Sequence, residues 1–542
     1  MFRSLFSVAG TDFCLCKTGF RKESFMIQIK NVSIVHKKDS IELISDLSFV
    51  LNDGDKAVFI GEEGNGKSTL LKLIYDEALV ADYVEYSGEI IRNNCILGYL
   101  PQELEQEEKE KSVYDFLSEE AGFWECEPKE LAMYARKLNI PISLLYSEQN
   151  MDTLSGGEKI KIYILRILCK KPDVLLLDEP SNDIDLNTLD WLEHFILEWD
   201  KAVLFVSHDE ILLERTANKI IHLEQLKKKK AVRHTVKNVD YETYVKERAV
   251  GIKKQEQIAK KERSEYKKQQ ERLRQISQKV EHQQETITRA DPHGARMLKK
   301  KMHTLKSMEK RFEKKYEQMT ENPDAEESIF IKFKEVEPLP AGKTVLNISL
   351  PRLMIKDRVL AQNIHLEIAG AKKVCIIGNN GVGKTTLIKC IAEKLLERTD
   401  IRAVYMPQNY EDLEAFKPSS DDTPVNYLTE NGDKEEITKI RTFLGSLKYT
   451  ADEMEHPVCD LSGGQKAKIM LLKICMSGAN VLILDEPTRN FSPLSGPVIR
   501  RMLADFPGAI ISVSHDKKYI NEVCDKVYLL TENGLNLVEE EI

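Results

Sequence analysis

Short runs of consecutive apolar residues recur along most of the chain, separated by longer stretches of mixed polarity. Examples are KAVFI at 56–60, VLLLD at 174–178, KVCII at 373–377 and VLILD at 481–485. Runs of this length without polar alternation are typical of strands that are buried on both faces of a parallel sheet. The pattern therefore predicts an α/β fold in which helices cover largely parallel sheets.

The middle of the chain follows a different period. Between 246 and 325, apolar residues recur every seven positions in two successive segments, with DPHG at 291–294 between them. This pattern predicts an antiparallel helical hairpin that projects beyond the globular parts, with a first helix about 60 Å long at ~1.5 Å per residue. The recurring positions are Tyr266, Leu273, Val280 and Ile287, with Ile276 between them, and then Leu298, Leu305, Phe312 and Met319, with Met302 and Tyr316 between them.

Motifs on the two sides of the predicted hairpin repeat in the same order with similar spacings. GEEGNGKST at 61–69, for example, returns as GNNGVGKTT at 378–386. The chain is therefore a tandem duplication with domains at 26–245 and 326–542, joined by a linker at 246–325. The other repeated motifs are GYLPQE (98–103) and VYMPQN (404–409), LSGGE (154–158) and LSGGQ (461–465), LLLDEP (175–180) and LILDEP (482–487), and VSHD (206–209 and 513–516).

Residues 1–25 do not fit this organisation. The segment MIQIKNVSIV, which opens at Met26, predicts a first strand, so we expect Met26 to be the native start and 1–25 to be an extension. A transit peptide is the alternative, because basic residues exceed acidic ones in this stretch.

Charge is unevenly distributed along the 542 residues. The net charge is −9, yet 246–320 hold 22 Lys and Arg against 11 Asp and Glu. A basic middle in an acidic chain indicates a polyanionic partner, although a passive coiled-coil spacer is the alternative.

The sequence contains no run of about 18 uncharged apolar residues, so it predicts no transmembrane helix. The ten cysteines are scattered, which fits a reducing cytoplasm, and the lone pair Cys14 and Cys16 predicts no zinc site.

The repeated GxxxxGK[ST] motif is a phosphate-binding loop (P-loop). Its glycines let backbone N–H groups converge on phosphate oxygens, and the helix that follows presents its positive N-terminus. Lys67 and Lys384 would reach the β and γ phosphates, and Ser68 and Thr385 would bind Mg²⁺. The nucleotide-binding residues predicted from the two loops are Gly61, Gly64, Asn65, Gly66, Lys67, Ser68 and Thr69, and Gly378, Asn379, Asn380, Gly381, Val382, Gly383, Lys384, Thr385 and Thr386.

A pair of acidic residues follows a buried strand in each copy. Asp178 and Asp485 end their strands, where they can help to hold Mg²⁺ through water. Glu179 and Glu486 come next, and a carboxylate there can orient or deprotonate the water that attacks ATP. An isolated acidic pair usually caps a helix, but the upstream P-loops favour the catalytic interpretation.

The LSGG motif requires a separate explanation. A serine and two glycines at the start of a helix form a further anion site, which would be redundant beside the ATP of the same copy. The motif is therefore expected to face the nucleotide of the other copy. Its residues are Ser155, Gly156 and Gly157 in the first copy and Ser462, Gly463 and Gly464 in the second.

Together these motifs resemble the ATP-binding cassette (ABC) superfamily over nearly the whole chain after Met26. The resemblance implies that cassette one (26–245) and cassette two (326–542) sandwich two ATP molecules head to tail. It also implies that His208 and His515 contact the γ-phosphate, and that Gln102 and Gln408 contact Mg²⁺ and water. Site one would join Lys67, Ser68, Gln102, Asp178, Glu179 and His208 to Ser462 and Gly464, and site two would join Lys384, Thr385, Gln408, Asp485, Glu486 and His515 to Ser155 and Gly157.

Two cassettes on one chain with a charged hairpin and no membrane domain resemble the ABC-F branch. The segment NVDYETYVKER at 238–248 is similar to the Y-x-x-Y segment that enters the linker in that branch. The resemblance implies a cytoplasmic monomer with an intramolecular cassette pair and no membrane or DNA partner. It also implies binding to the 70S ribosome, where the linker enters the E site and meets 23S rRNA and the P-site tRNA.

The spacing within cassette one narrows the resemblance. Gln102 and Leu154 are 52 positions apart, and Gln408 and Leu461 are 53 apart, so cassette one carries no added arm. This resembles the bacterial antibiotic-resistance branch, which protects ribosomes from drugs at the peptidyl-transferase centre, and residues 281–303 would then approach the tRNA. A housekeeping translation factor, a transporter ATPase subunit and a DNA-repair ATPase are the alternatives.

The residues after LDEP, which form the D-loop, differ between the copies. By register, Asp185 corresponds to Ser492, and Asn182 corresponds to Arg489. In the ABC family the D-loop crosses to the P-loop of the opposite cassette, so site one would receive Ser492 and site two would receive Asp185. We therefore expect the two sites to hydrolyse ATP differently, with neutral drift in a tolerant loop as the alternative.

Overall fold

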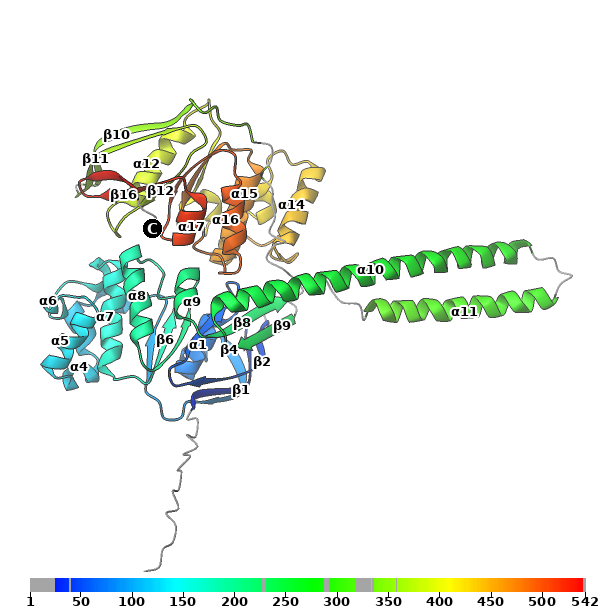
Figure 1. Cartoon of the computed structure of the whole chain (residues 1–542), viewed down its shortest axis with the longest axis horizontal. Helices are drawn as coiled ribbons and strands as arrows, with labels where there is room; N and C mark the ends of the chain where they lie inside the picture. The colour runs from blue at the N-terminus through cyan, green and yellow to red at the C-terminus, as the bar shows by residue number, and fades with distance from the viewer. Residues whose placement is uncertain are drawn as a thin grey trace, which may run out of the picture.

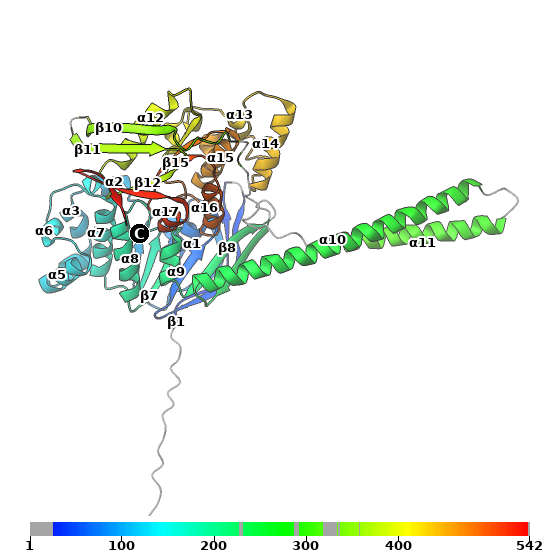
Figure 2. The same cartoon turned by 45° about the horizontal axis from the view of Figure 1, so that its top comes forward.

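Two globular cassettes lie against each other, and a long helical hairpin projects from one side of the pair in both views (Figures 1 and 2). This computed structural model describes residues 25–38, 40–226, 231–286, 292–317, 333, 336–356 and 358–539. Within these residues no helix is long and apolar enough to cross a membrane.

Each cassette is built on a six-stranded sheet with the same strand order. In cassette one the order is β5-β6-β7-β3-β8-β9, and in cassette two it is β13-β14-β15-β12-β16-β17. All neighbouring strands are parallel except the last pair of each sheet, which confirms the predicted α/β fold. The bounds are β5 Leu97–Leu100, β6 Val174–Asp178, β7 Ala202–Val206, β3 Lys56–Ile60, β8 Lys219–Leu226 and β9 Ala231–Lys237, and β13 Ala403–Met406, β14 Val481–Asp485, β15 Ala509–Val513, β12 Lys373–Ile377, β16 Lys526–Thr531 and β17 Gly534–Val538.

Antiparallel strands form an additional layer in each cassette, which the sequence analysis did not predict. In cassette one, β1 (Phe25–His36) pairs with both β2 (Glu42–Asn52) and β4 (Val84–Ile91). In cassette two, β10 (Thr344–Ile355) pairs with β11 (Arg358–Ala369). These strands bury only one face, so their apolar residues alternate with exposed ones instead of forming an uninterrupted run.

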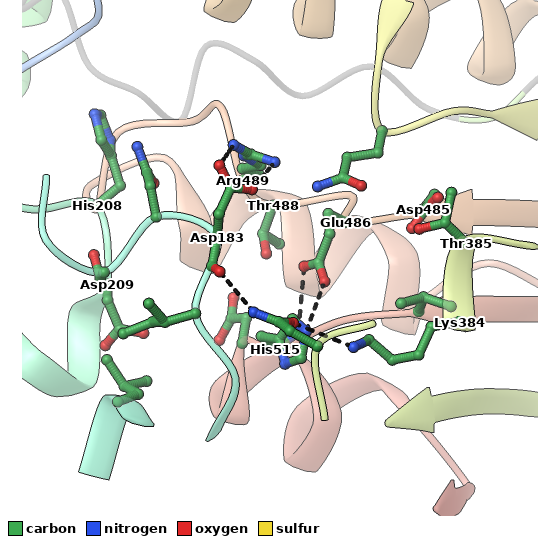
Figure 3. Close-up of a pocket in the computed structure, with 18 of the residues that line it drawn as sticks. Asp183, His208, Asp209, Lys384, Thr385, Asp485, Glu486, Thr488, Arg489 and His515 are labelled. Carbon is green, nitrogen blue, oxygen red and sulfur yellow. Dashed lines mark hydrogen bonds and ion pairs between the residues drawn. The ribbon is translucent and has the colours of Figure 1, made fainter. Parts of the chain in front are cut away.

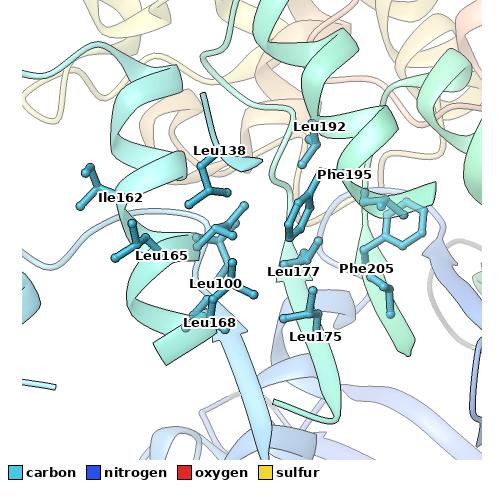
Figure 4. Close-up of a cluster of buried hydrophobic side chains, with 14 of the residues drawn as sticks. Leu100, Leu138, Ile162, Leu165, Leu168, Leu175, Leu177, Leu192, Phe195 and Phe205 are labelled. Carbon is cyan, nitrogen blue, oxygen red and sulfur yellow. The ribbon is translucent and has the colours of Figure 1, made fainter. Parts of the chain in front are cut away.

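Helices pack on opposite faces of each parallel sheet. In cassette one, α1 (Lys67–Tyr75) packs with the antiparallel layer on one face, while α7 (Gly156–Cys169) and α8 (Leu186–Glu198) pack on the other. Figure 4 shows side chains of α7 and α8 packed around Leu175 and Leu177 of β6. In cassette two, α12 (Lys384–Leu396) and α15 (Gly463–Met476) are likewise on opposite faces. The P-loop and the LSGG motif of one cassette are therefore separated by their own sheet.

The linker is a helical hairpin, as predicted, although its boundaries differ. Helix α10 spans Tyr241–Thr286 and α11 spans Pro292–Glu317. The first helix thus begins before residue 246, within the range predicted for cassette one. DPHG was predicted as a turn, but Pro292 opens α11, a first-turn position at which the missing N–H of proline leaves no hydrogen bond unmade.

The contact between the two hairpin helices is narrower than a full heptad seam. Val280 and Leu305 are buried together, with Leu273 and Met302 packed against them. The rings of Tyr266 and Phe312 lie 6.4 Å apart between centroids. Ile276 was predicted to join this seam, but its side chain is 49% exposed and does not belong to the buried cluster. Ile287 and Met319, and the side chains of Leu298 and Tyr316, lie outside the described part of the chain.

Candidate nucleotide sites between the cassettes

Both P-loops have the backbone geometry that the motif requires. Gly66 and Gly383 cap α1 and α12 with left-handed backbone angles, φ 80° and 102°. A Cβ at Gly61 would lie 2.3 Å from the Leu223 carbonyl oxygen, so the loop also needs glycine for its close approach to β8. The N–H groups at the start of each helix are thereby presented to a phosphate.

The P-loop lysines fold back over their own loops. Lys67 Nζ donates to the carbonyl oxygens of Gly61 (3.0 Å) and Glu62 (2.8 Å), and Lys384 Nζ donates to that of Gly378 (2.9 Å). Burial lowers the pKa of both lysines below the usual range. An anion in the loop would compensate for that cost of burial, which is the role predicted for these residues.

The strand-end aspartates are suited to a divalent cation. Asp178 Oδ1 accepts a hydrogen bond from Ser68 Oγ (2.8 Å), and Figure 3 shows Thr385 next to Asp485. Asp178 Oδ2 and both carboxylate oxygens of Asp485 are buried without a hydrogen-bond partner in the described structure, and burial raises the pKa of both groups to about 6. Mg²⁺ would satisfy these oxygens, with the hydroxyls of Ser68 and Thr385 as further ligands.

The cation would also need ligands from the nucleotide. In the described parts of the chain, no three His, Cys, Asp or Glu side chains converge as a metal cage would require. Mg²⁺ typically binds through one or two protein oxygens together with substrate phosphates. Bound there, the ion would neutralise charge on the β and γ phosphates.

The two glutamates that follow the aspartates are held in strained backbone conformations. Glu179 and Glu486 have φ angles of 48° and 52°, in the left-handed region that non-glycine residues seldom adopt. Backbone strain of this kind is found where the surrounding structure enforces a functional geometry. Each glutamate lies near a histidine, His208 for Glu179 and His515 for Glu486, as expected for a group that orients a water molecule.

The two glutamate–histidine pairs differ in electrostatics. Glu179 lies 3.1 Å from His208 Nε2; burial raises the pKa of Glu179, but this histidine, together with Lys67 and Asn182, more than reverses the increase and lowers the pKa to about 2. At the other site, burial and Asp485 raise the pKa of Glu486 to about 8, and the distance to His515 Nε2 is 3.8 Å. The pKa of His515 is lowered to about 4, mainly by burial. The pKa values of the two equivalent glutamates are therefore shifted in opposite directions.

Site two opens into a wide cavity of about 580 Å³ between the cassettes. Figure 3 shows Lys384, Glu486 and His515 of cassette two together with Asp183 of the opposite D-loop. Asn380 Nδ2 donates to the Asp183 carbonyl oxygen (2.6 Å), so this D-loop contacts the opposite P-loop as predicted. The predicted residues that line the cavity are Asn380, Gly381, Gly383, Lys384, Thr385, Thr386, Gln408, Asp485, Glu486, His208 and His515.

A smaller cavity of about 50 Å³ lies where the first P-loop faces the LSGG motif of cassette two, within the part of the interface predicted to form site one. Gly61 and Asn65 of the first P-loop line it together with Ser462 and Gly464 of cassette two, the head-to-tail arrangement that was predicted. His208, predicted for site one, also reaches across the interface, where its Nδ1 lies 2.9 Å from the Phe491 carbonyl oxygen.

Other predicted residues are not brought together in these cavities. Gln102 is exposed and lines neither cavity, and the same two cavities are lined by none of Lys67, Ser68, Asp178, Glu179, Ser155 and Gly157. Their assignment to the nucleotide sites stays a prediction.

Ion pairs across the interface were missed by the sequence analysis. Arg500 of α16 (Gly496–Ala504) forms two hydrogen bonds to Glu210 of α9 (Glu210–Thr216), at 2.7 and 3.1 Å. Lys517 pairs with Asp190 at 2.5 Å, and Arg489 pairs with the D-loop carboxylate of Asp183 at 2.8 Å. Residue types alone contain no signal for such pairs, because the partners are hundreds of positions apart.

Comparisons with known proteins agree with this architecture. The model of the family described as "ABC transporter" matches residues 44–182 and 361–489. ABC transporter F family member 2 of Arabidopsis thaliana is 26% identical, covering 94% of this chain and 77% of its own length. Ribosome protection protein VmlR of Bacillus subtilis is 28% identical, covering 94% of this chain and 87% of its own length. The archaeal ribosome recycling factor aABCE1, solved with the stalk protein aP1, shares the fold with a TM-score of 0.56 and 17% identity, covering 94% and 91% of the two chains. The chain therefore belongs to the ABC family, as an ABC-F-type ATPase with two ATP-binding cassettes in tandem.

Proposed function

We propose that the chain is a ribosome-binding ATPase that protects the peptidyl-transferase centre of the 70S ribosome from antibiotics. Its hairpin would enter the E site, contact 23S rRNA and the P-site tRNA, and displace the drug or reset the tRNA. The relative VmlR is named a ribosome protection protein, and its similarity covers 94% of this chain. ATP would close the cassettes and thereby set the angle of the hairpin, and hydrolysis would release it.

The charge near the far end of the hairpin carries this proposal. Arg296, Lys299, Lys300, Lys301 and Lys306 of α11 are all exposed. The hairpin carries them away from the cassettes, so they contribute nothing to the ATP sites (Figure 1). A run of exposed cations on a projecting helix is suited to the phosphate backbone of RNA.

The base of α10 contacts strand β8 of cassette one, and these contacts can link ATP binding in the cassettes to RNA binding by the hairpin. The Tyr244 hydroxyl of α10 lies 2.7 Å from His222 Nδ1, and Arg248 pairs with Glu224 at 2.7 Å. Both partners lie on β8 and line the site-one cavity. A change in site one can therefore move the base of α10 through direct contacts.

Cosedimentation with 70S ribosomes tests the partner. The Glu179→Gln/Glu486→Gln double variant is expected to pellet with ribosomes in the presence of ATP, because it binds ATP and cannot complete hydrolysis. A matched Lys67→Ala/Lys384→Ala variant should not pellet, since its P-loops lose their phosphate contacts. Absence of pelleting by the first variant, with bound ATP measured directly, would refute ribosome binding and favour a membrane partner.

A charge-matched pair of hairpin variants tests the contact surface. Changing Lys299, Lys300 and Lys301 to glutamine should weaken pelleting and flatten its salt dependence, since three phosphate contacts are removed. The same change at three exposed lysines near the base of α10 should have a smaller effect; these are Lys253, Lys254 and Lys260. Equal effects of the two triples would indicate non-specific attraction.

Drug protection is tested separately, by translation in vitro with peptidyl-transferase inhibitors and added protein. Restored translation supports antibiotic protection. If the protein binds ribosomes but does not restore translation in the presence of any inhibitor of this class, the result would instead indicate a housekeeping translation factor.

A further inference from the structure

Two acidic residues lie on the P-loop of site one. Glu62 and Glu63 occupy the positions that Asn379 and Asn380 hold in the second P-loop. A carboxylate on a phosphate-binding loop repels the triphosphate that the loop must hold. Its presence on one loop only calls for a local explanation.

Both carboxylates are directed to cassette two. Glu62 pairs with Lys448 at 3.2 Å and with Lys468 at 2.9 Å. Burial raises the pKa of Glu62, but the two lysines more than reverse this and lower it to about 2. Glu63 accepts a hydrogen bond from the Gly464 backbone N–H, within the LSGG motif at the start of α15. Glu63 therefore places a carboxylate against the amide that was predicted to bind the nucleotide phosphate.

The second P-loop makes different contacts: its asparagines meet the D-loop and α8 of cassette one, and the D-loop carboxylate of Asp185 accepts a hydrogen bond from the Asn380 backbone N–H. Asn380 donates to a D-loop carbonyl oxygen of cassette one, and Asn379 Oδ1 accepts a hydrogen bond from Asn187 (3.4 Å). No carboxylate from the second P-loop lies against cassette one at this site. The small volume of the cavity beside Glu63, about 50 Å³, agrees with a protein contact that closes the space between the first P-loop and the LSGG motif of cassette two.

The change in the D-loop now has a physical explanation. Ser492, which replaces the acid found at Asp185, lines the same small cavity as Glu62 and Glu63. An aspartate at this position would add a third carboxylate to a confined space, at a considerable electrostatic cost. The acid absent from the D-loop of cassette two is thus matched by acids on the P-loop that faces it.

We propose that Glu63 is a built-in substitute for a nucleotide phosphate at the LSGG motif of site one. The carboxylate closes this half of the interface by itself, and ATP contacts the LSGG motif only after it displaces Glu63. Site two, which contains no such group, accepts ATP at lower concentrations. The two sites therefore fill in a fixed order.

Equilibrium binding of ATP and Mg²⁺ tests the order of filling. Measured in the Glu179→Gln/Glu486→Gln background, calorimetry should resolve a tight and a weak site. Glu63→Asn, which copies the residue of the second P-loop, should tighten the weak site about tenfold or more, since a charge-assisted contact no longer competes. The reciprocal Asn380→Glu should weaken the tight site. Unchanged affinity of both sites in Glu63→Asn would overturn the proposal.

Hydrogen exchange at the start of α15 provides an independent readout. Without ATP, the Gly464 amide should be protected in the unaltered chain and exchange faster in Glu63→Asn, and ATP should restore protection in the variant. An unaltered thermal transition confirms that the variant is folded. Exchange at Gly464 that is the same in both proteins without ATP would show that Glu63 does not hold this amide.

Discussion

Arg500 forms a buried ion pair between the cassettes, and its removal is expected to open them. Its side chain is 3% exposed and holds Glu210 by two hydrogen bonds, at 2.7 and 3.1 Å. Arg500→Met would keep the packing volume but leave the buried Glu210 carboxylate without its main partner. Breaking a buried ion pair in this way costs about 3–5 kcal/mol.

The lower end of that range applies here. Lys518 Nζ remains 3.2 Å from Glu210 Oε2 and compensates part of the charge. A cost of about 3 kcal/mol corresponds to a shift of roughly a hundredfold in the equilibrium between closed and open cassettes. Because hydrolysis needs the closed pair, kcat/KM for ATP should fall by up to this factor. Arg501→Met, which removes an exposed arginine from the next position, is the matched control and should have little effect.

The double variant Glu210→Gln/Arg500→Met distinguishes an ion-pair effect from a packing effect. It removes the isolated carboxylate as well as its partner, so it should lose less activity than Arg500→Met alone. Steady-state ATPase assays of the two single variants and the double variant complete the cycle, and thermal unfolding verifies the folded state of each. A double variant as impaired as the sum of the singles would refute the reasoning, because the two residues would then act independently.

The remaining predictions concern the cation, the core and the hairpin. Removal of divalent cations with EDTA should abolish ATP hydrolysis, and added Mg²⁺ should restore it, because the buried unpaired oxygens of Asp178 and Asp485 are suited to hold a cation against the phosphates. Phe205→Ala should lower the free energy of unfolding by about 3–5 kcal/mol, since this side chain is fully buried in β7; denaturant titration measures the change. Leu305→Ala should speed hydrogen exchange in both hairpin helices by removing the contact with Val280, while basal ATPase stays unchanged.

The sequence by itself determined the features that depend on local chemistry. The P-loops, the strand-end acids and the parallel sheets follow from short motifs and from uninterrupted apolar runs such as VLLLD at 174–178, and the structure has all of them. Heptad spacing similarly predicted the hairpin and placed Val280 and Leu305 among its repeating apolar positions, and the structure shows these two residues in contact. Such features need only neighbours within a few turns or strands, so residue type and spacing are sufficient.

The tertiary structure alone decided which residues meet between the cassettes. Glu63 and Gly464 are separated by 401 positions, and Glu210 and Arg500 by 290, and their contacts depend on how two rigid domains are placed. Of the one-sided antiparallel strands, the sequence predicted β1 but not the layer it joins, because apolar residues in strands such as β11 are interspersed with exposed ones. Register revealed that the D-loops differ, but only the tertiary structure places Ser492 in the lining of the same cavity as Glu62 and Glu63 of the opposite P-loop. Charge acts through distance in space, which the order of residues along the chain does not specify.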